Sequence, residues 1–237
     1  MKIALIGYGR MGKQIEAMAQ EKGHLIVAKI NSKSSQKIES LADCDVAIEF
    51  TQPDAAILNF TSILHQNIPL VTGTTGWYSE MNKVSQLVSN LNGKFFYASN
   101  FSPGVFITHH LTRELARVMN SFEYNGEIEE WHHTRKKDAP SGTAQTLANE
   151  VILEHQNYSG SHLKSEEAPD DSIEITSHRV GDVKGTHVVR FVSDIDSIEI
   201  KHEAFSRDGF ALGALMAAEF LVNQKPGIYT MNNLIQL

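Results

Sequence analysis

The sequence predicts an α/β protein with two parts, a doubly wound parallel sheet and a second part with a sheet of its own. Over the first hundred residues, short apolar runs alternate with amphipathic stretches, which is typical of strands covered by helices on both faces. A glycine-rich turn joins the first apolar run to the first amphipathic stretch. After about residue 102 the predicted strands alternate between apolar and polar residues, which indicates a sheet packed on one face.

The first part shows a β–α alternation that favours parallel strands with right-handed crossovers. Pro53 suits the first position of a helix, and Gly23 suits the left-handed residue that follows a helix end. Strands are expected at residues 3–6, 25–30, 46–50, 70–72 and 95–97, and helices at residues 10–22, 53–65 and 78–91.

The second part contains longer predicted strands. In the last of them Ile198, Ile200 and His202 share one face, and charged residues share the other. The polar and acidic residues 157–172 are expected to form a mobile loop. Helices are expected at residues 103–119 and 141–155, strands at 173–180, 186–192 and 197–204, and an apolar helix at 210–222 that packs back on the first part.

Composition excludes several classes of protein. The 237 residues allow one large or two modest domains, and 41% hydrophobic with 21% charged residues is typical of soluble globular chains. The net charge is −7, whereas proteins that bind nucleic acids or anionic membranes generally carry an excess of positive charge. The single cysteine forms no internal disulfide, and no apolar run is long enough for a membrane span. These features predict a cytoplasmic protein.

Gly7, Gly9 and Gly12 form a G-x-G-x-x-G pattern between the first predicted strand and the first predicted helix. In this setting the first glycine permits a tight turn, the second lets the backbone approach a pyrophosphate, and the third lets the helix pack closely on the strand. The N-terminus of the helix then offers free N–H groups to phosphates. The pattern predicts a dinucleotide site, and a plain tight turn is the alternative.

The end of the second predicted strand bears on the choice of cofactor. An acidic residue is expected there to bind the adenosine ribose, whereas this chain has Asn31, Ser32 and Lys33. Asn31 can bond a 2′-hydroxyl, and Ser32 and Lys33 can accept a 2′-phosphate. We therefore expect NADPH, or both NADPH and NADH, as cofactor; for Lys33 a place in a solvated loop is the alternative.

Two further loops follow predicted strands at the carboxyl edge, where such folds bind ligands. Gly73, Thr74 and Thr75 are small, so their backbone amides and hydroxyls can line a nicotinamide. Phe50 and Thr51 end the third predicted strand, and we interpret them in the same way. An ordinary loop is the alternative for both segments.

Residues 130–143, EWHHTRKKDAPSGT, hold five potentially cationic side chains within six positions of an acidic protein. Ser141, Gly142 and Thr143 open a predicted helix and offer hydroxyls and free N–H groups to an anion. Together they predict a site for a carboxylated small molecule, with a histidine as proton donor. The alternatives are two histidines without function on a surface loop, and a zinc site, for which the sequence shows no further suitably spaced ligands.

From end to end, the chain resembles the 4-hydroxy-tetrahydrodipicolinate reductases (dihydrodipicolinate reductases) of lysine and diaminopimelate synthesis. The most specific match runs from Glu130 to Ala144. The chain is short for that family, and Asn31 stands where the family commonly has an acidic residue. The other matching motifs lie at residues 7–12, 73–76, 99–105, 179–181, 185–187 and 202–207.

The resemblance implies a Rossmann-type dinucleotide-binding domain of residues 1–103 and 207–237. An α+β domain of residues 104–206, with a mixed or antiparallel sheet, is then inserted for substrate binding and oligomerisation. It also implies an oxidoreductase that uses NADPH or NADH on a small dicarboxylate, and a homotetramer in which the long strands pair between subunits.

The resemblance further implies a role for each motif residue. His132 is expected to donate a proton and Lys136 to assist it, without a metal. His133, Ser141, Gly142 and Thr143 are expected to bind substrate. Cofactor contacts are expected at Gly7, Tyr8, Gly9, Arg10, Met11, Gly12, Asn31, Ser32, Lys33, Phe50, Thr51, Gly73, Thr74, Thr75, Ala98, Ser99, Asn100 and Phe101.

Two other functions share part of this pattern. A related two-domain dehydrogenase, such as an aspartate dehydrogenase, has the first domain but should lack the motif of residues 132–143. A non-catalytic sensor of NAD(P) keeps the glycines and needs no proton donor.

Overall fold

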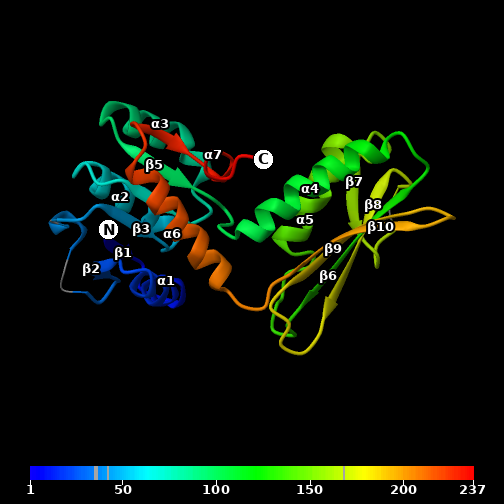
Figure 1. Cartoon of the computed structure of the whole chain (residues 1–237), viewed down its shortest axis with the longest axis horizontal. Coiled ribbons are helices and arrows are strands. Elements are labelled where there is room, and N and C mark those ends of the chain that lie inside the picture. Colours follow the sequence, from blue (N-terminus) through cyan, green and yellow to red (C-terminus); the bar gives the residue numbers. More distant parts are fainter. Residues whose placement is uncertain (35–36, 42, 168) are drawn as a thin grey trace. The chain divides into compact units, whose positions relative to one another are not determined.

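A computed structural model of the chain describes residues 1–34, 37–41, 43–167 and 169–237 (Figure 1). Its contacts divide the chain into two compact units. Unit 1 consists of Met1–Pro103 and Asp208–Leu237, and unit 2 consists of Gly104–Arg207. Among the described residues, no helix is both long and apolar enough to cross a membrane.

Unit 1 is a six-stranded parallel sheet in the order β11-β5-β4-β3-β1-β2, which confirms the doubly wound fold. Its strands are β1 Lys2–Ile6, β2 Leu25–Ile30, β3 Val46–Glu49, β4 Leu70–Thr72, β5 Lys94–Tyr97 and β11 Gly227–Tyr229. Its helices are α1 Arg10–Glu21, α2 Pro53–Leu64, α3 Met81–Asn90, α6 Asp208–Val222 and α7 Met231–Leu234, with 3₁₀ turns η1 Ile38–Ser40 and η2 Tyr78–Glu80.

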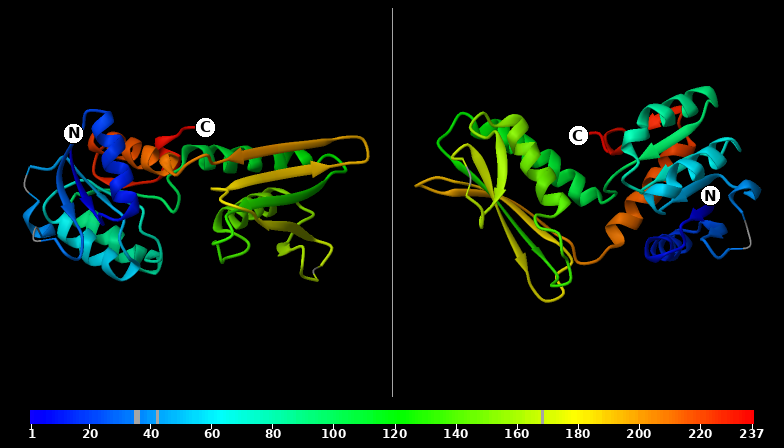
Figure 2. Two further views of the ribbon diagram at one scale, coloured as in Figure 1. Left: turned by 90° about the horizontal axis from the view of Figure 1, so that it is seen from below. Right: turned by 180° about the vertical axis from the view of Figure 1, so that it is seen from behind.

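Helices cover both faces of this sheet. Phe60 of α2 and Phe95 of β5 pack edge to face in a core that also contains residues of α3. On the other face, α6 contacts α1 and the strands β3, β4 and β5 (Figures 1 and 2). Strands buried on both faces carry continuous apolar runs, which explains why the sequence indicated them.

Two expectations for unit 1 need correction. The helix expected at 78–91 begins with the 3₁₀ turn η2 and becomes α-helical only at Met81. Strand β11 and helix α7 follow α6 and were not expected. Because β11 has three residues, it is too short to show a period in the sequence.

Unit 2 is a five-stranded mixed sheet in the order β10-β9-β6-β8-β7, in which β6 runs parallel to β8 and antiparallel to β9. A core of apolar side chains from α4, α5 and the sheet fills one face. The strands are β6 Asn125–His132, β7 Gly160–Leu163, β8 Ser172–Arg179, β9 Thr186–Val192 and β10 Ser197–Glu203, and the helices are α4 Pro103–Met119 and α5 Gly142–Glu154.

Two features of unit 2 differ from those expected. Strand β6 was not expected; it ends at His132 and separates β8 from β9, although those strands are consecutive in the chain. The segment 157–172 contains the edge strand β7, paired in parallel with β8, and is not a loop throughout. Its composition is polar because edge strands are half exposed. Ala168 of this segment lies outside the described residues.

A close backbone approach seats α6 in unit 1. A Cβ atom at Gly213 would lie 1.7 Å from the carbonyl oxygen of Phe101, so only glycine fits without movement of the backbone. Gly142, at the start of α5, has no atom within 4 Å of the same position.

We expect Gly213→Ala to lower the free energy of unfolding by about 1–3 kcal/mol, the usual cost of overpacking, or more. Gly142→Ala should change it by less than about 1 kcal/mol, because alanine is the better helix former. Thermal and urea unfolding followed by circular dichroism compares the two variants. Equal stability of Gly213→Ala and the wild type would contradict the close approach.

Candidate active site and cofactor site

The register of the unit 2 sheet places polar side chains in a row across four strands. Glu130 on β6 lies opposite His187 on β9 and Ser177 on β8, and His187 lies opposite His202 on β10. Glu130 has no exposed surface, and His187 is 5% exposed. His132 follows Glu130 by two residues, so both side chains point to the same face of the sheet.

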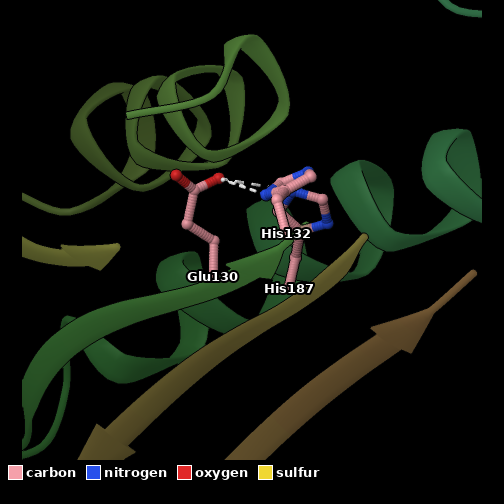
Figure 3. Close-up of side chains that lie close together, drawn as sticks. All are labelled: Glu130, His132 and His187. Atoms are coloured by element: carbon pink, nitrogen blue, oxygen red, sulfur yellow. Dashed lines mark ion pairs between the residues drawn. The ribbon is translucent and has the colours of Figure 1, made fainter. Parts of the chain in front are cut away.

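The two oxygens of the Glu130 carboxylate have different partners. Oε1 accepts hydrogen bonds from the backbone N–H of Ser141 at 3.0 Å, from Ser177 Oγ at 2.7 Å and from Arg179 Nη2 at 3.2 Å. Oε2 faces two imidazole rings, with His132 Nδ1 at 3.3 Å and His187 Nε2 at 3.8 Å (Figure 3). Glu130 therefore joins β6, β8, β9 and the start of α5.

These contacts decide the charge of Glu130 and His187. Burial raises the pKa of Glu130, but the His132 ring and hydrogen bonds from Ser141 and Ser177 outweigh it, so that this pKa lies well below its usual range. Burial, reinforced by the neighbouring His132, lowers the pKa of His187 to about 3. The site therefore holds a carboxylate anion and a neutral His187 at neutral pH.

Helix α5 begins beside this carboxylate. Ser141 is its N-cap, and Ser141 Oγ accepts a hydrogen bond from the backbone N–H of Ala144 at 3.2 Å. No acidic residue lies in the first turn. Gly142 and Thr143 therefore present first-turn N–H groups at the positive end of the helix dipole, as an anion site requires.

The remaining cations of the motif have separate surroundings. Lys136 Nζ lies 2.6 Å from Asp138 Oδ2, and Arg179 donates to the backbone oxygens of both residues. Arg135 forms an exposed ion pair with Asp182. Lys137 is exposed, and His133 is half-buried with Nδ1 unpartnered among the described side chains. Of the five cations, His132 alone faces Glu130.

Glu130, His132 and His187 also bring three potential metal ligands within 4.8 Å of one another. The third potential ligand, His187, comes from β9 through its pairing with β6. It was therefore not evident from the spacing of residues along the chain. The Arg179 guanidinium already neutralises the same carboxylate, which disfavours a second cation there.

In unit 1 the predicted cofactor loops meet at the carboxyl ends of the strands. Thr51 N donates to Thr74 Oγ1 at 2.7 Å, and the rings of Phe50 and Phe101 lie 5.7 Å apart. A Cβ at Gly7 would lie 1.9 Å from the Phe50 oxygen, whereas a Cβ at Gly9 would meet nothing within 4 Å. Gly7 is thus required by the fold, and Gly9 leaves the open approach that a pyrophosphate needs.

Not every predicted cofactor residue takes part in these contacts. Ala98 N donates to Thr72 O at 3.3 Å, and Asn100 Oδ1 accepts from Ser102 N at 2.8 Å. Tyr8 donates its hydroxyl to Glu16. Gly12 is buried and Met11 half-buried, whereas Arg10, Ser32, Lys33, Thr75 and Ser99 are exposed.

The side chain of Asn31 closes the turn after β2. Its Oδ1 accepts from the backbone N–H of Lys33 at 2.8 Å, and its own N–H donates to Ser34 Oγ at 2.9 Å. While Oδ1 accepts in the turn, the N–H groups of the Asn31 side-chain amide can donate to a ligand. Such donors suit a phosphate, which only accepts.

Four residues that the predicted site omitted belong to these networks. Glu130, Arg179 and His187 surround His132, and in unit 1 the buried Glu49 accepts from Thr72 at 2.6 Å and from Thr51. The first three lie in matched motifs, and Glu130 is two residues from His132, the spacing of one strand face. Recognition of residues 125–132 as a strand would have identified Glu130.

The low pKa of His187 predicts a pH dependence of stability. Between pH 6.5, the ordinary pKa of histidine, and about pH 3, the ring is protonated in the unfolded state but not in the native state. The free energy of unfolding therefore falls as pH falls through this window, by about 1.4 kcal/mol per pH unit for one proton.

In His187→Gln, the slope of the free energy of unfolding against pH should be smaller by up to the contribution of one proton. His65→Gln, at an exposed position, should keep the slope of the wild type. Urea unfolding at intervals between about pH 5 and about pH 7 measures it. Parallel curves for the wild type and His187→Gln would contradict a neutral buried His187.

Models of two family domains match the chain: dihydrodipicolinate reductase, N-terminus, over residues 1–101, and dihydrodipicolinate reductase, C-terminus, over residues 104–235. The 4-hydroxy-tetrahydrodipicolinate reductase of Christiangramia forsetii is 44% identical over 236 residues, 99% of this chain and 98% of that protein. That of Staphylococcus aureus (strain MSSA476) is 38% identical over 248 residues, 99% of this chain and all of that protein.

A solved structure shows the same fold. The dipicolinate-bound dihydrodipicolinate reductase from Paenisporosarcina sp. TG-14 aligns with a TM-score of 0.79 at 22% identity, over 99% of this chain and all of that one. The family models together cover both units, and two relatives exceed 30% identity over their whole lengths. The chain belongs to the dihydrodipicolinate reductase family.

Proposed function

We propose that this chain reduces 4-hydroxy-tetrahydrodipicolinate to tetrahydrodipicolinate with NADPH or NADH, in the synthesis of diaminopimelate and lysine. Family membership over the whole length supports the reaction. The observation that carries the mechanism is the buried Glu130–His132 pair beside the N-terminus of α5. A dicarboxylate substrate agrees with the dipicolinate bound to the Paenisporosarcina enzyme.

The cofactor supplies a hydride when it is bound. The glycine-rich loop and the loops after β3, β4 and β5 fit such a group, because Gly9 keeps the approach to the start of α1 open. That helix carries neither an acidic residue in its first turn nor a side-chain cap, so its first N–H groups are available to phosphates. We assign cofactor binding to the residues named for it above, with Asn31, Ser32 and Lys33 at the adenosine ribose.

We assign His132 as the proton donor and Lys136 as its assistant. The charge that develops on the substrate ring as hydride arrives has to be neutralised by a proton. His132 Nδ1 faces Glu130, so Nε2 is the ring atom left for the substrate. Lys136 adds positive charge that stabilises the developing anion.

We assign the substrate carboxylates to His133, Ser141, Gly142 and Thr143. Charge-assisted hydrogen bonds to the N-terminus of a helix are among the stronger interactions available to a carboxylate. His133 Nδ1 is buried and unpartnered among the described side chains, which suits a residue that awaits a ligand. No metal is assigned to the reaction.

We further propose that the chain acts as a homotetramer in the cytoplasm, with residues 104–206 as the domain for substrate binding and oligomerisation. The face of the unit 2 sheet away from its core supports this assignment. It carries Arg190 in ion pairs with Glu127, Glu129 and Glu199, and these side chains are between about a quarter and a half exposed. An extended strand surface of this kind can pair with a second copy.

His132→Gln should lower turnover by about 10²- to 10⁴-fold, the range for loss of a general acid. Affinity for NADPH should change little, since the cofactor residues lie in unit 1. NADPH consumption with substrate made in situ by the preceding synthase measures turnover, and fluorescence titration measures cofactor binding. His65→Gln, at an exposed position of unit 1 with no assigned role, is the control and should keep normal turnover. Near-normal turnover of His132→Gln would refute the assignment, and weak NADPH binding alone would not.

Asn31→Asp should shift cofactor preference towards NADH. Aspartate keeps an oxygen for the N–H of Lys33, so the turn persists while a negative charge meets the 2′-phosphate. An exposed charge contact is worth about 0.2–1 kcal/mol, so the ratio of kcat/KM values should change by a factor between about 1.4 and about 5.

Asn31→Ser keeps a turn-forming oxygen without the charge and serves as the control. Both ratios are measured at one ionic strength, because salt screens the contact. A wild type that strongly prefers NADH, or an unchanged ratio in Asn31→Asp, would place ribose recognition elsewhere.

A further inference from the structure

The two oxygens of the Glu130 carboxylate differ in their hydrogen bonds, and a purely structural role in the sheet does not explain this difference. Ser141, Ser177 and Arg179 all donate to Oε1, whereas Oε2 has no hydrogen bond among the described residues and points at the two rings. His132 Nδ1, the nearest of these ring atoms, also has no other hydrogen bond there. Two orphaned buried atoms thus face each other across 3.3 Å.

We infer that Glu130 is a positioning residue for proton donation, which holds His132 with Nδ1 as hydrogen-bond donor and Nε2 towards the substrate. The inference rests on the proposed role of His132. It adds a residue that the predicted site omitted and that touches neither substrate nor cofactor in this role.

The chemistry of the two groups explains the arrangement. A carboxylate accepts hydrogen bonds only, so a ring nitrogen that faces it has to carry the proton. His132 is then protonated at both nitrogens before transfer, and only at Nδ1 after Nε2 has given up its proton. Oε2 can accept a hydrogen bond from Nδ1 in both states, so the ring keeps its orientation while Nε2 gives up its proton.

The other groups described around Glu130 do not compete with His132 for Oε2. His187 is neutral, lies further from Oε2 at 3.8 Å and has Ser141 Oγ within 3.3 Å of the same nitrogen. Arg179 on β8 contacts Oε1 only. Behind His187 lie His202 on β10 and His109 on α4, and burial lowers the pKa of each ring. The residue of the α5 start that contacts Glu130 is Ser141, which carries no charge.

A glycine keeps Nε2 accessible. A Cβ atom at Gly185 would lie 3.3 Å from His132 Nε2 and would crowd the nitrogen that has to meet the substrate. Gly185 also has φ at +149°, which side chains rarely adopt. Carboxylate and glycine thus act on opposite nitrogens of one ring.

The test replaces Glu130 by glutamine, which keeps shape and the acceptor for Ser141, Ser177 and Arg179. Its amide N–H₂ then faces Nδ1 and favours the tautomer with the proton on Nε2, which opposes a doubly protonated ring. We expect kcat to fall about 10²- to 10⁴-fold, with the KM for substrate and the affinity for NADPH little changed. The alkaline fall of kcat/KM should move about one pH unit or more towards acid.

Glu154→Gln is the matched control. Glu154 is the last residue of α5, the helix that begins beside Glu130, and pairs with Arg117 at 3.0 Å. The same chemical change there should leave kcat and the pH profile unaltered. Glu130→Asp, which keeps the charge, should restore part of kcat and the position of the pH profile. A loss of kcat in Glu130→Gln without a shift of the profile, or an equal loss in Glu154→Gln, would overturn the inference.

A double variant separates this inference from the proposed function. If Glu130 acts through His132, Glu130→Gln adds no further loss of turnover to His132→Gln, whereas multiplied losses would overturn the inference. Normal turnover of His132→Gln would instead refute the proposed donor. If Glu130→Gln fails to fold, Glu130→Asp moves the carboxylate away from Nδ1, and the part of kcat that it loses should add nothing to the loss in His132→Gln; multiplied losses would again overturn the inference.

A metal ion held by Glu130, His132 and His187 predicts a different outcome. Dialysis of the wild type against EDTA would then abolish turnover, and added Zn²⁺ would restore it. We expect full turnover after EDTA, and loss with rescue by Zn²⁺ would replace the positioning role by a metal site.

Discussion

A carboxylate without exposed surface needs hydrogen-bond donors, and Glu130 obtains them from two side chains of β8 and from the backbone at the start of α5. Unpaired, such an anion would cost several kcal/mol, so the sheet register, the N-cap of α5 and the Arg179 side chain depend on one another. Unit 2 is ordered around this buried charge at one end of its apolar core. His132 lies where it does because it ends the strand that carries Glu130.

Unit 1 depends on a different constraint, the contact of backbone with backbone. Gly7 and Phe50 approach so closely that no side chain fits between them, and Gly213 meets Phe101 in the same manner. These contacts bring the loops after β1, β3 and β5 together at one sheet edge. Gly9 has no such neighbour, so its small size serves the ligand and not the fold.

The sequence predicted elements well where one physical rule dominated. Strands β1, β3, β4 and β5 are apolar because helices cover both faces, and α4, α5 and α6 were found within two residues at either end. Strand β6 was missed because its inward positions near the site are Glu130 and His132, which break the apolar pattern. The motif identified His132, but the carboxylate that faces it gains its partners from β8 and β9, and that strand pairing is not visible in local sequence.

The two segments of unit 1 are separated in the chain by all of unit 2. During synthesis β1 to β5 leave the ribosome first, while α6, which covers β3, β4 and β5, follows only after residue 207. Until then one apolar face of the nascent sheet lacks its cover, and the edge of β5 lacks β11. The nucleotide-binding fold is thus completed last although it begins first, and a chain that stops after unit 2 would expose a surface prone to aggregation.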